Sequence, residues 1–73
     1  MNVQSPNTHA TRTKLLRLPE VMALTGIRST AIYDAIQQGQ FPAPVKLGRA
    51  SAWVEHEVHD WITARMEERD SAA

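Results

Sequence analysis

Residues 18–49 read LPEVMALTGIRSTAIYDAIQQGQFPAPVKLGR, and this stretch decides the fold. Its first part predicts a helix of about two turns that ends at Gly26. Pro19 suits the first helical turn, where its missing N–H costs nothing, and Gly26 suits a left-handed C-terminal cap. Val21 and Leu24 lie on one face of this helix. The glycine therefore marks a tight turn that leads into the next segment.

A second helix is predicted over residues 29–38. Its apolar positions recur at helical spacing and are Ile32, Ala35 and Ile36. Ser29 or Thr30 is expected to cap its N-terminus, because a hydroxyl oxygen there accepts hydrogen bonds from free backbone N–H groups. Gly39 ends the helix, and Pro42 prevents an immediate restart. The two short helices and their glycine turn indicate a helix-turn-helix, although a plain helical hairpin in a small α+β domain has the same spacing.

The face of the second helix opposite its apolar positions is polar. On a wheel of about 100° per residue, this face carries Thr30, Tyr33, Asp34 and Gln37. A helix-turn-helix places its second helix in the major groove of DNA, with such a polar face against the base edges. These residues are therefore the predicted base-reading set. For Tyr33, the alternative is that its ring covers the small core.

A β-hairpin with a basic tip is predicted after the second helix. Two short segments, 45–47 and 52–54, flank the sequence Gly48-Arg49-Ala50-Ser51, in which the glycine suits a tight turn. A hairpin that follows a helix-turn-helix is a wing, which reaches phosphates beside the groove. This wing spans 45–54. The predicted phosphate-binding residues are Arg28 and Ser29 at the start of the second helix and Lys46 and Arg49 on the wing.

Segments on either side complete the domain. Residues 14–18, KLLRL, predict an edge strand, and residues 55–70, EHEVHDWITARMEERD, predict the longest helix. The apolar stripe of that helix is Val58, Trp61, Ile62, Arg65 and Met66. The predicted class is α+β, mainly α, with the architecture of a winged helix-turn-helix. The predicted organisation is a disordered N-terminal arm over 1–13, a DNA-binding domain over 14–69 and a loose tail over 70–73.

Charge is distributed unevenly, although the chain carries no net charge. Residues 1–49 hold six lysines and arginines against two acidic residues, a net +4, and residues 50–73 hold two against six, a net −4. Such a charge asymmetry is a better indicator of an anionic partner than the net charge of the whole chain. A short chain can also have such an asymmetry by chance. Arg12, Lys14 and Arg17 are predicted either to contact the DNA backbone as an arm or to be solvated cations.

The composition excludes several classes of function. The chain of 73 residues has no cysteine, which excludes a disulfide scaffold and a cysteine-based zinc site. His56 and His59 lack a well-placed third ligand, and a chain of this size offers no pocket of enzyme size. No catalytic residue, metal or cofactor is therefore expected. No apolar run approaches the roughly 20 residues of a membrane span, and the polar N-terminus is not a secretory signal, so a cytoplasmic location is expected.

Three segments of the chain together resemble the AlpA-type phage regulators: LLRLPEVMALTG, IYDAIQQGQFPAPVKLG and WVEHEVHDWI. The resemblance runs from Leu15 to Arg69, which is most of the chain. It implies a small winged helix-turn-helix protein related to phage excisionases and distantly to the MerR-type fold. It also implies DNA binding by a regulator that a prophage or mobile element encodes. Members of this family act as transcriptional activators or as excision factors.

The chain departs from the family pattern mainly in the second helix. Such proteins usually carry SRST after the turn, a basic residue after the tyrosine and Lys-Glu before the glycine, whereas this chain has IRST, Asp34 and Gln37-Gln38. The exposed face is thus nearly neutral or acidic, which weakens the attraction to phosphates. Asp34 either accepts a hydrogen bond from a cytosine N4 amine or bonds locally and limits non-specific binding. In the third helix, His56 occupies the position at which family members often have a serine that caps the helix N-terminus. Glu55 is the alternative capping residue.

The expected partner is double-stranded DNA, and three roles are open. The first is a transcription regulator, more often an activator than a repressor. The second is an excision factor that bends attachment-site DNA for an integrase. The third is a protein-interaction module whose acidic last helix binds RNA polymerase or the integrase. The oligomeric state is also open, because the sequence shows no heptad seam.

Overall fold

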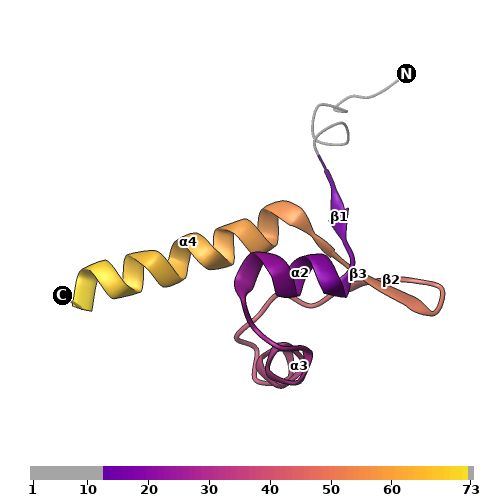
Figure 1. The fold of residues 1–73 in the computed structure, drawn as a ribbon, viewed down its shortest axis with the longest axis horizontal. Coiled ribbons are helices and arrows are strands. Elements are labelled where there is room, and N and C mark those ends of the chain that lie inside the picture. The colour runs from indigo at the N-terminus through magenta and orange to yellow at the C-terminus, as the bar shows by residue number, and fades with distance from the viewer. Residues whose placement is uncertain (1–12, 73) are drawn as a thin grey trace.

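The computed structural model describes residues 13–72 and contains three helices and a small sheet (Figure 1). The elements in chain order are β1 (Leu15–Leu16), α2 (Leu18–Thr25), α3 (Ser29–Gln37), β2 (Val45–Leu47), β3 (Ala50–Val54) and α4 (Glu55–Ala72). This order of strand, two short helices, hairpin and long helix confirms the predicted α+β, mainly α class. It is compatible with a winged helix-turn-helix.

The sheet has three antiparallel strands in the order β1-β3-β2. β1 pairs with the end of β3, with Leu16 opposite Trp53, and is an edge strand as predicted. β2 and β3 form the hairpin, in which Leu47 lies opposite Ala50. The loop is therefore only Gly48 and Arg49, and β3 begins earlier than the sequence predicted. A loop this short needs a positive φ, which Gly48 supplies at 65°.

The ends of α2 follow the local sequence. Its first turn contains Pro19, and the backbone N–H of Arg17 donates to the Glu20 carboxylate at 2.8 Å. At its C-terminus, Gly26 adopts the left-handed conformation (φ 74°) and donates its N–H to the Met22 carbonyl at 2.8 Å. Gly26 thus ends the helix as predicted and turns the chain towards α3.

The helix α3 begins at Ser29 as predicted, but its N-cap differs from the prediction. Arg28, with an extended backbone (φ −75°, ψ 159°), occupies the N-cap position, and no side chain caps the helix. The prediction that Ser29 or Thr30 caps α3 is therefore wrong, because Ser29 is already the first helical residue. The preceding turn instead uses Thr25, whose hydroxyl donates to the Val21 carbonyl at 2.8 Å and accepts from the Ile27 N–H at 3.2 Å.

The core lies between the helices and the inner face of the sheet. Its buried residues are Leu16, Val21, Ile32, Phe41, Trp53 and Val58. Trp53 belongs to this core, since it is fully buried and its indole N–H donates to the Pro42 carbonyl at 3.0 Å. Trp61 is only half-buried, and its indole donates to the Gln40 carbonyl at 2.7 Å. The two indoles thereby hold the loop between α3 and β2.

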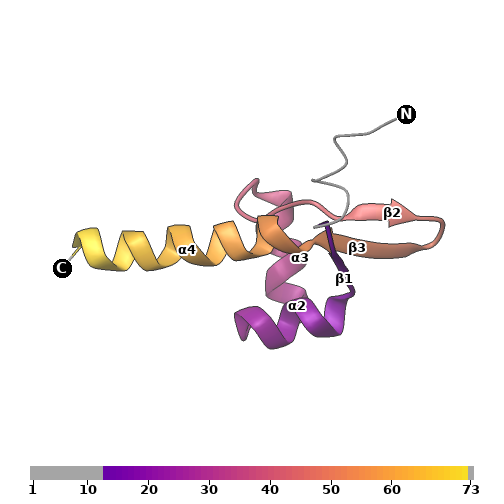
Figure 2. The ribbon, with the colours of Figure 1, turned by 90° about the horizontal axis from the view of Figure 1, so that it is seen from above.

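Only the first half of α4 packs against the body of the protein. Val58 is buried and Ile62 is half-buried, but Arg65 and Met66 of the predicted apolar stripe are exposed. Figures 1 and 2 show the C-terminal half of α4 projecting away from the other elements. The helix continues to Ala72, so residues 70–72 are helical rather than a loose tail.

The predicted arm over 1–13, with Arg12, lies outside the described residues except for Thr13. None of the helices within residues 13–72 combines the length and apolarity that crossing a membrane requires.

Candidate nucleic-acid interface

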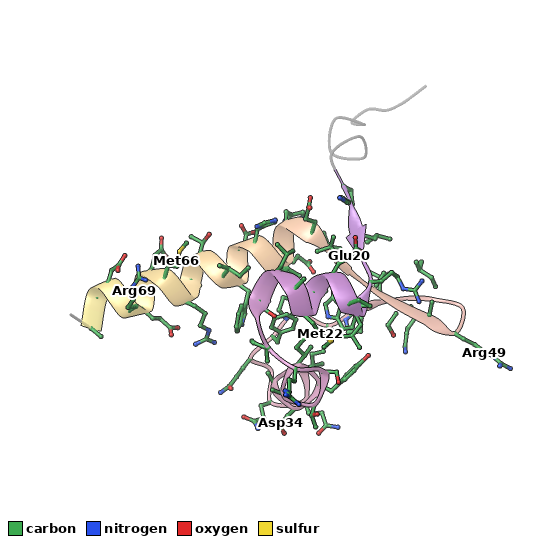
Figure 3. All side chains as sticks on the ribbon, viewed as in Figure 1. Glu20, Met22, Asp34, Arg49, Met66 and Arg69 are labelled. Atoms are coloured by element: carbon green, nitrogen blue, oxygen red, sulfur yellow. The ribbon has the colours of Figure 1, made fainter. Side chains whose placement is uncertain are left out.

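The second helix of the pair, α3, presents one side to the rest of the protein and the other to solvent. Ile32 is fully buried in the core, while Thr30, Tyr33, Asp34 and Gln37 are all exposed. In Figure 3, Asp34 lies on the side of α3 that faces away from α2. The predicted base-reading residues therefore share a polar, accessible surface of one helix.

Tyr33 is exposed on α3 and also contacts the core. Its side chain is 43% exposed, yet its ring lies edge-on to the buried ring of Trp53, with centroids 6.1 Å apart. Aromatic rings prefer such an edge-to-face arrangement. The contact fixes the ring at the margin of the core and leaves the rest of the side chain on the α3 surface.

Asp34 has a partner that the sequence reasoning did not assign to the site. The side-chain amide of Gln38, one helical turn later, donates to Asp34 Oδ2 at 2.9 Å. Both side chains are exposed. The spacing i, i+4 was the available signal, because residues four apart on a helix lie on the same face.

The predicted phosphate contacts on the wing fall into two kinds. Arg49 occupies the hairpin loop, and Figure 3 shows its side chain extending from the tip of the wing. Lys46, one strand position from the loop, donates to Ser51 Oγ at 2.9 Å on the facing strand. The Lys46 ammonium is thus held against the hairpin, whereas the Arg49 guanidinium has no partner among residues 13–72 and extends outward.

The remaining predicted cations differ in how the fold holds them. Arg17 Nε donates to the Ser51 carbonyl at 3.2 Å, which ties the start of α2 to the wing. Within residues 13–72, the side chains of Arg28 and Arg49 have no hydrogen-bond or ion-pair partner. Lys14 is exposed and its carbonyl accepts the Glu55 N–H at 2.7 Å, while Ser29 is half-buried in the first turn of α3. The described surface therefore brings Arg17, Lys46 and Arg49 to the wing and leaves Arg28 at the start of α3.

Residues 13–72 contain no group of three or more His, Cys, Asp and Glu side chains that could hold a metal ion. The two histidines of α4 do not converge on a common ligand. His56 Nδ1 instead lies 3.7 Å from Asp60 Oδ2 on the next turn, and both side chains are exposed.

The fold and this surface define a winged helix-turn-helix protein. The chain belongs to the family described as prophage CP4-57 regulatory protein (AlpA), whose profile matches residues 14–66. This match confirms the resemblance to AlpA-type regulators.

Two relatives support the same assignment. The protein described as uncharacterized protein ORF88 of Enterobacteria phage P4 is 40% identical over 62 residues, which cover 84% of this chain and 70% of that protein. The DNA-binding transcriptional activator AlpA of Escherichia coli (strain K12) is 32% identical over 59 residues, which cover 71% of this chain and 84% of that protein. No solved structure matches the chain at a significant level.

Proposed function

We propose that this protein is a sequence-specific DNA-binding regulator of transcription, encoded by a prophage or mobile element and acting as an activator. The observation that carries the proposal is the exposed polar side of α3, followed in the chain by a hairpin whose tip carries Arg49, an arginine without a side-chain partner in residues 13–72. The similarity to a relative described as a DNA-binding transcriptional activator supports it. Such a protein acts where the DNA is, in the cytoplasm.

The proposed mechanism divides the surface by chemistry. The α3 residues Thr30, Tyr33, Asp34 and Gln37 face base edges in the major groove, which has room for one helix. Arg28, Ser29, Lys46 and Arg49 contact phosphates and set the register of the protein on the duplex. Lys46 exchanges its bond to Ser51 for a phosphate oxygen, while Arg49 has no partner in residues 13–72 to give up.

The projecting half of α4 favours a second role on the same chain. α4 carries six acidic residues against two arginines, and its C-terminal half is exposed on all sides. An activator that binds DNA through α3 and the wing leaves this helix available to a protein such as RNA polymerase. An integrase is the corresponding partner if the protein acts in excision.

Fluorescence anisotropy with the full chain tests the DNA-binding proposal. One labelled duplex comes from the DNA around the gene itself, and a scrambled duplex of equal length is the control. With three to six phosphate contacts, we expect tighter binding to the native duplex and a slope of log affinity against log salt of roughly −3 to −5. Equal affinity for the two duplexes would exclude sequence reading, and no binding at low salt would exclude the proposed function altogether.

A further inference from the structure

The Asp34–Gln38 pair is the unexpected feature of the α3 surface. Asp34 is the one acidic residue of α3, and it lies on the exposed side of the helix (Figure 3). A carboxylate on a surface that approaches phosphates is repelled by them unless it meets a hydrogen-bond donor. The bond from Gln38 Nε2 to Asp34 Oδ2 at 2.9 Å supplies one donor within the protein.

The pair still has unused hydrogen-bonding capacity after this bond is made. A carboxylate only accepts, so the amide of Gln38 must turn its NH₂ towards Asp34. That NH₂ has a second N–H, and Asp34 Oδ1 has no partner within residues 13–72. The pair thus presents an acceptor, Oδ1, beside a donor, the second N–H of Gln38.

Base edges in the major groove offer a matching pattern. The donors there are the exocyclic amines, N4 of cytosine and N6 of adenine. Each lies next to an acceptor, which is O6 of the paired guanine for cytosine and N7 of the same base for adenine. An acceptor and a donor held together on one helix face are complementary to either arrangement.

We propose that Asp34 and Gln38 act as a unit that reads an exocyclic amine of a base in the major groove. Asp34 Oδ1 accepts the hydrogen bond from the amine, and Asp34 is the specificity-determining residue. Gln38 holds the carboxylate in place and donates its second N–H to the acceptor beside the amine. This inference rests on the proposed DNA-binding function and assigns one of its base contacts.

A purely structural role for the pair makes a different prediction. Hydrogen-bonded pairs at i, i+4 stabilise helices, so loss of the pair would then lower stability and weaken binding to all sequences equally. Base preference at a single position is the readout that separates the two roles. It changes only if the pair contacts a base.

The test uses the full chain and the native duplex with each base pair replaced in turn. Wild type is compared with Asp34→Ala, Asp34→Asn and Gln38→Ala, each checked for native circular dichroism. We expect one position at which wild type discriminates roughly 5- to 100-fold and Asp34→Ala does not discriminate. Gln38→Ala is expected to reduce the discrimination partly. Asp60→Ala is the matched control and keeps the preference at that position, because Asp60 is also an exposed carboxylate with a side-chain partner four residues away, His56, but it lies on α4.

Base analogues then identify the amine. Purine in place of adenine and 2-pyrimidinone in place of cytosine remove only the exocyclic amino group at the chosen position. The analogue that weakens wild type and leaves Asp34→Ala unchanged names the base. The inference is overturned if wild type reads sequence and Asp34→Ala keeps the same preference at every position. If wild type does not distinguish native from scrambled DNA, the proposed sequence-specific DNA binding is itself wrong. The two results differ, so failure of the base contact can be told from failure of the proposed function.

Discussion

The arginines near α3 and the wing tip differ from those on α4 in whether their side chains have partners. Arg28, at the start of α3, and Arg49, at the wing tip, have no side-chain partner within residues 13–72. On α4, Arg65 bonds to Glu68 at 2.8 Å and Arg69 to Asp70 at 3.0 Å. A net charge of zero therefore conceals unpaired cations near the α3 surface and neutralised ones on α4. The net charge of the whole chain therefore underestimates how well the region of α3 and the wing suits an anionic partner.

The same two regions differ in packing. Trp53, on β3, is fully buried and contacts Tyr33 of α3, so the wing and α3 share the core. Trp61, on α4, is half-buried against Phe41, and the Arg65 guanidinium lies 4.9 Å from its ring centroid. Beyond this point, the side-chain bonds that α4 makes within residues 13–72 join its own residues, Arg65 to Glu68 and Arg69 to Asp70. The C-terminal half of α4 therefore contributes little to the core and leaves its surface accessible.

Replacement of Trp53 by alanine is expected to have the largest effect. Loss of a fully buried indole and of its bond to Pro42 lowers the free energy of unfolding by about 3–5 kcal/mol, which is most of the stability of a domain this small. Urea unfolding followed by circular dichroism measures the change. Trp61→Ala is the comparison and costs less, because part of that ring already contacts water. Equal decreases in the free energy of unfolding for the two variants would contradict this, and would show that Trp61 of α4 contributes as much to the core as Trp53 does.

Replacement of a free arginine affects DNA binding more than replacement of a paired one. Arg49→Ala is expected to weaken binding to all sequences about equally and to reduce the magnitude of the salt slope by about 1. Arg69→Ala is the matched control and leaves the slope unchanged, because Arg69 is paired with Asp70 on α4. Anisotropy titrations over a range of salt concentrations give both slopes. An unchanged slope for Arg49→Ala would mean that the wing does not touch the DNA backbone.

Removal of residues 67–73 is expected to have the smallest effect. The exposed end of α4 supports no core residue, so the free energy of unfolding changes by about 0.5 kcal/mol or less. DNA affinity then changes by no more than about 2-fold. A promoter–reporter assay in cells measures activation by the truncated protein, and the anisotropy titration measures its DNA binding. Lost activation with intact DNA binding would assign the end of α4 to a protein partner, and lost DNA binding would contradict the division of roles.

Features that depend on neighbouring residues were predictable from the sequence. Pro19 marks the start of α2 because its φ is fixed, and Gly26 marks the end because glycine tolerates a positive φ. Gly48 supplies the positive φ that the hairpin loop needs. The spacing of apolar residues also identified the buried side of α3. The N-cap of α3 was predicted wrongly because a hydroxyl residue is only one way to begin a helix, and here Arg28 fills the N-cap position with no side-chain bond.

What the sequence determined by itself was the order of elements, the turns and the polar face of α3, since these follow from local propensity and periodicity. Only the tertiary structure decided which cations are free, which tryptophan is buried and where α4 leaves the body. Arg17, for example, is bound to Ser51, 34 residues away, and a bond of this kind exists only after β1, β3 and the wing have come together. Periodicity has no information about such a long-range partner, and it distinguishes Arg17 from Arg49, whose side chain has no partner within residues 13–72.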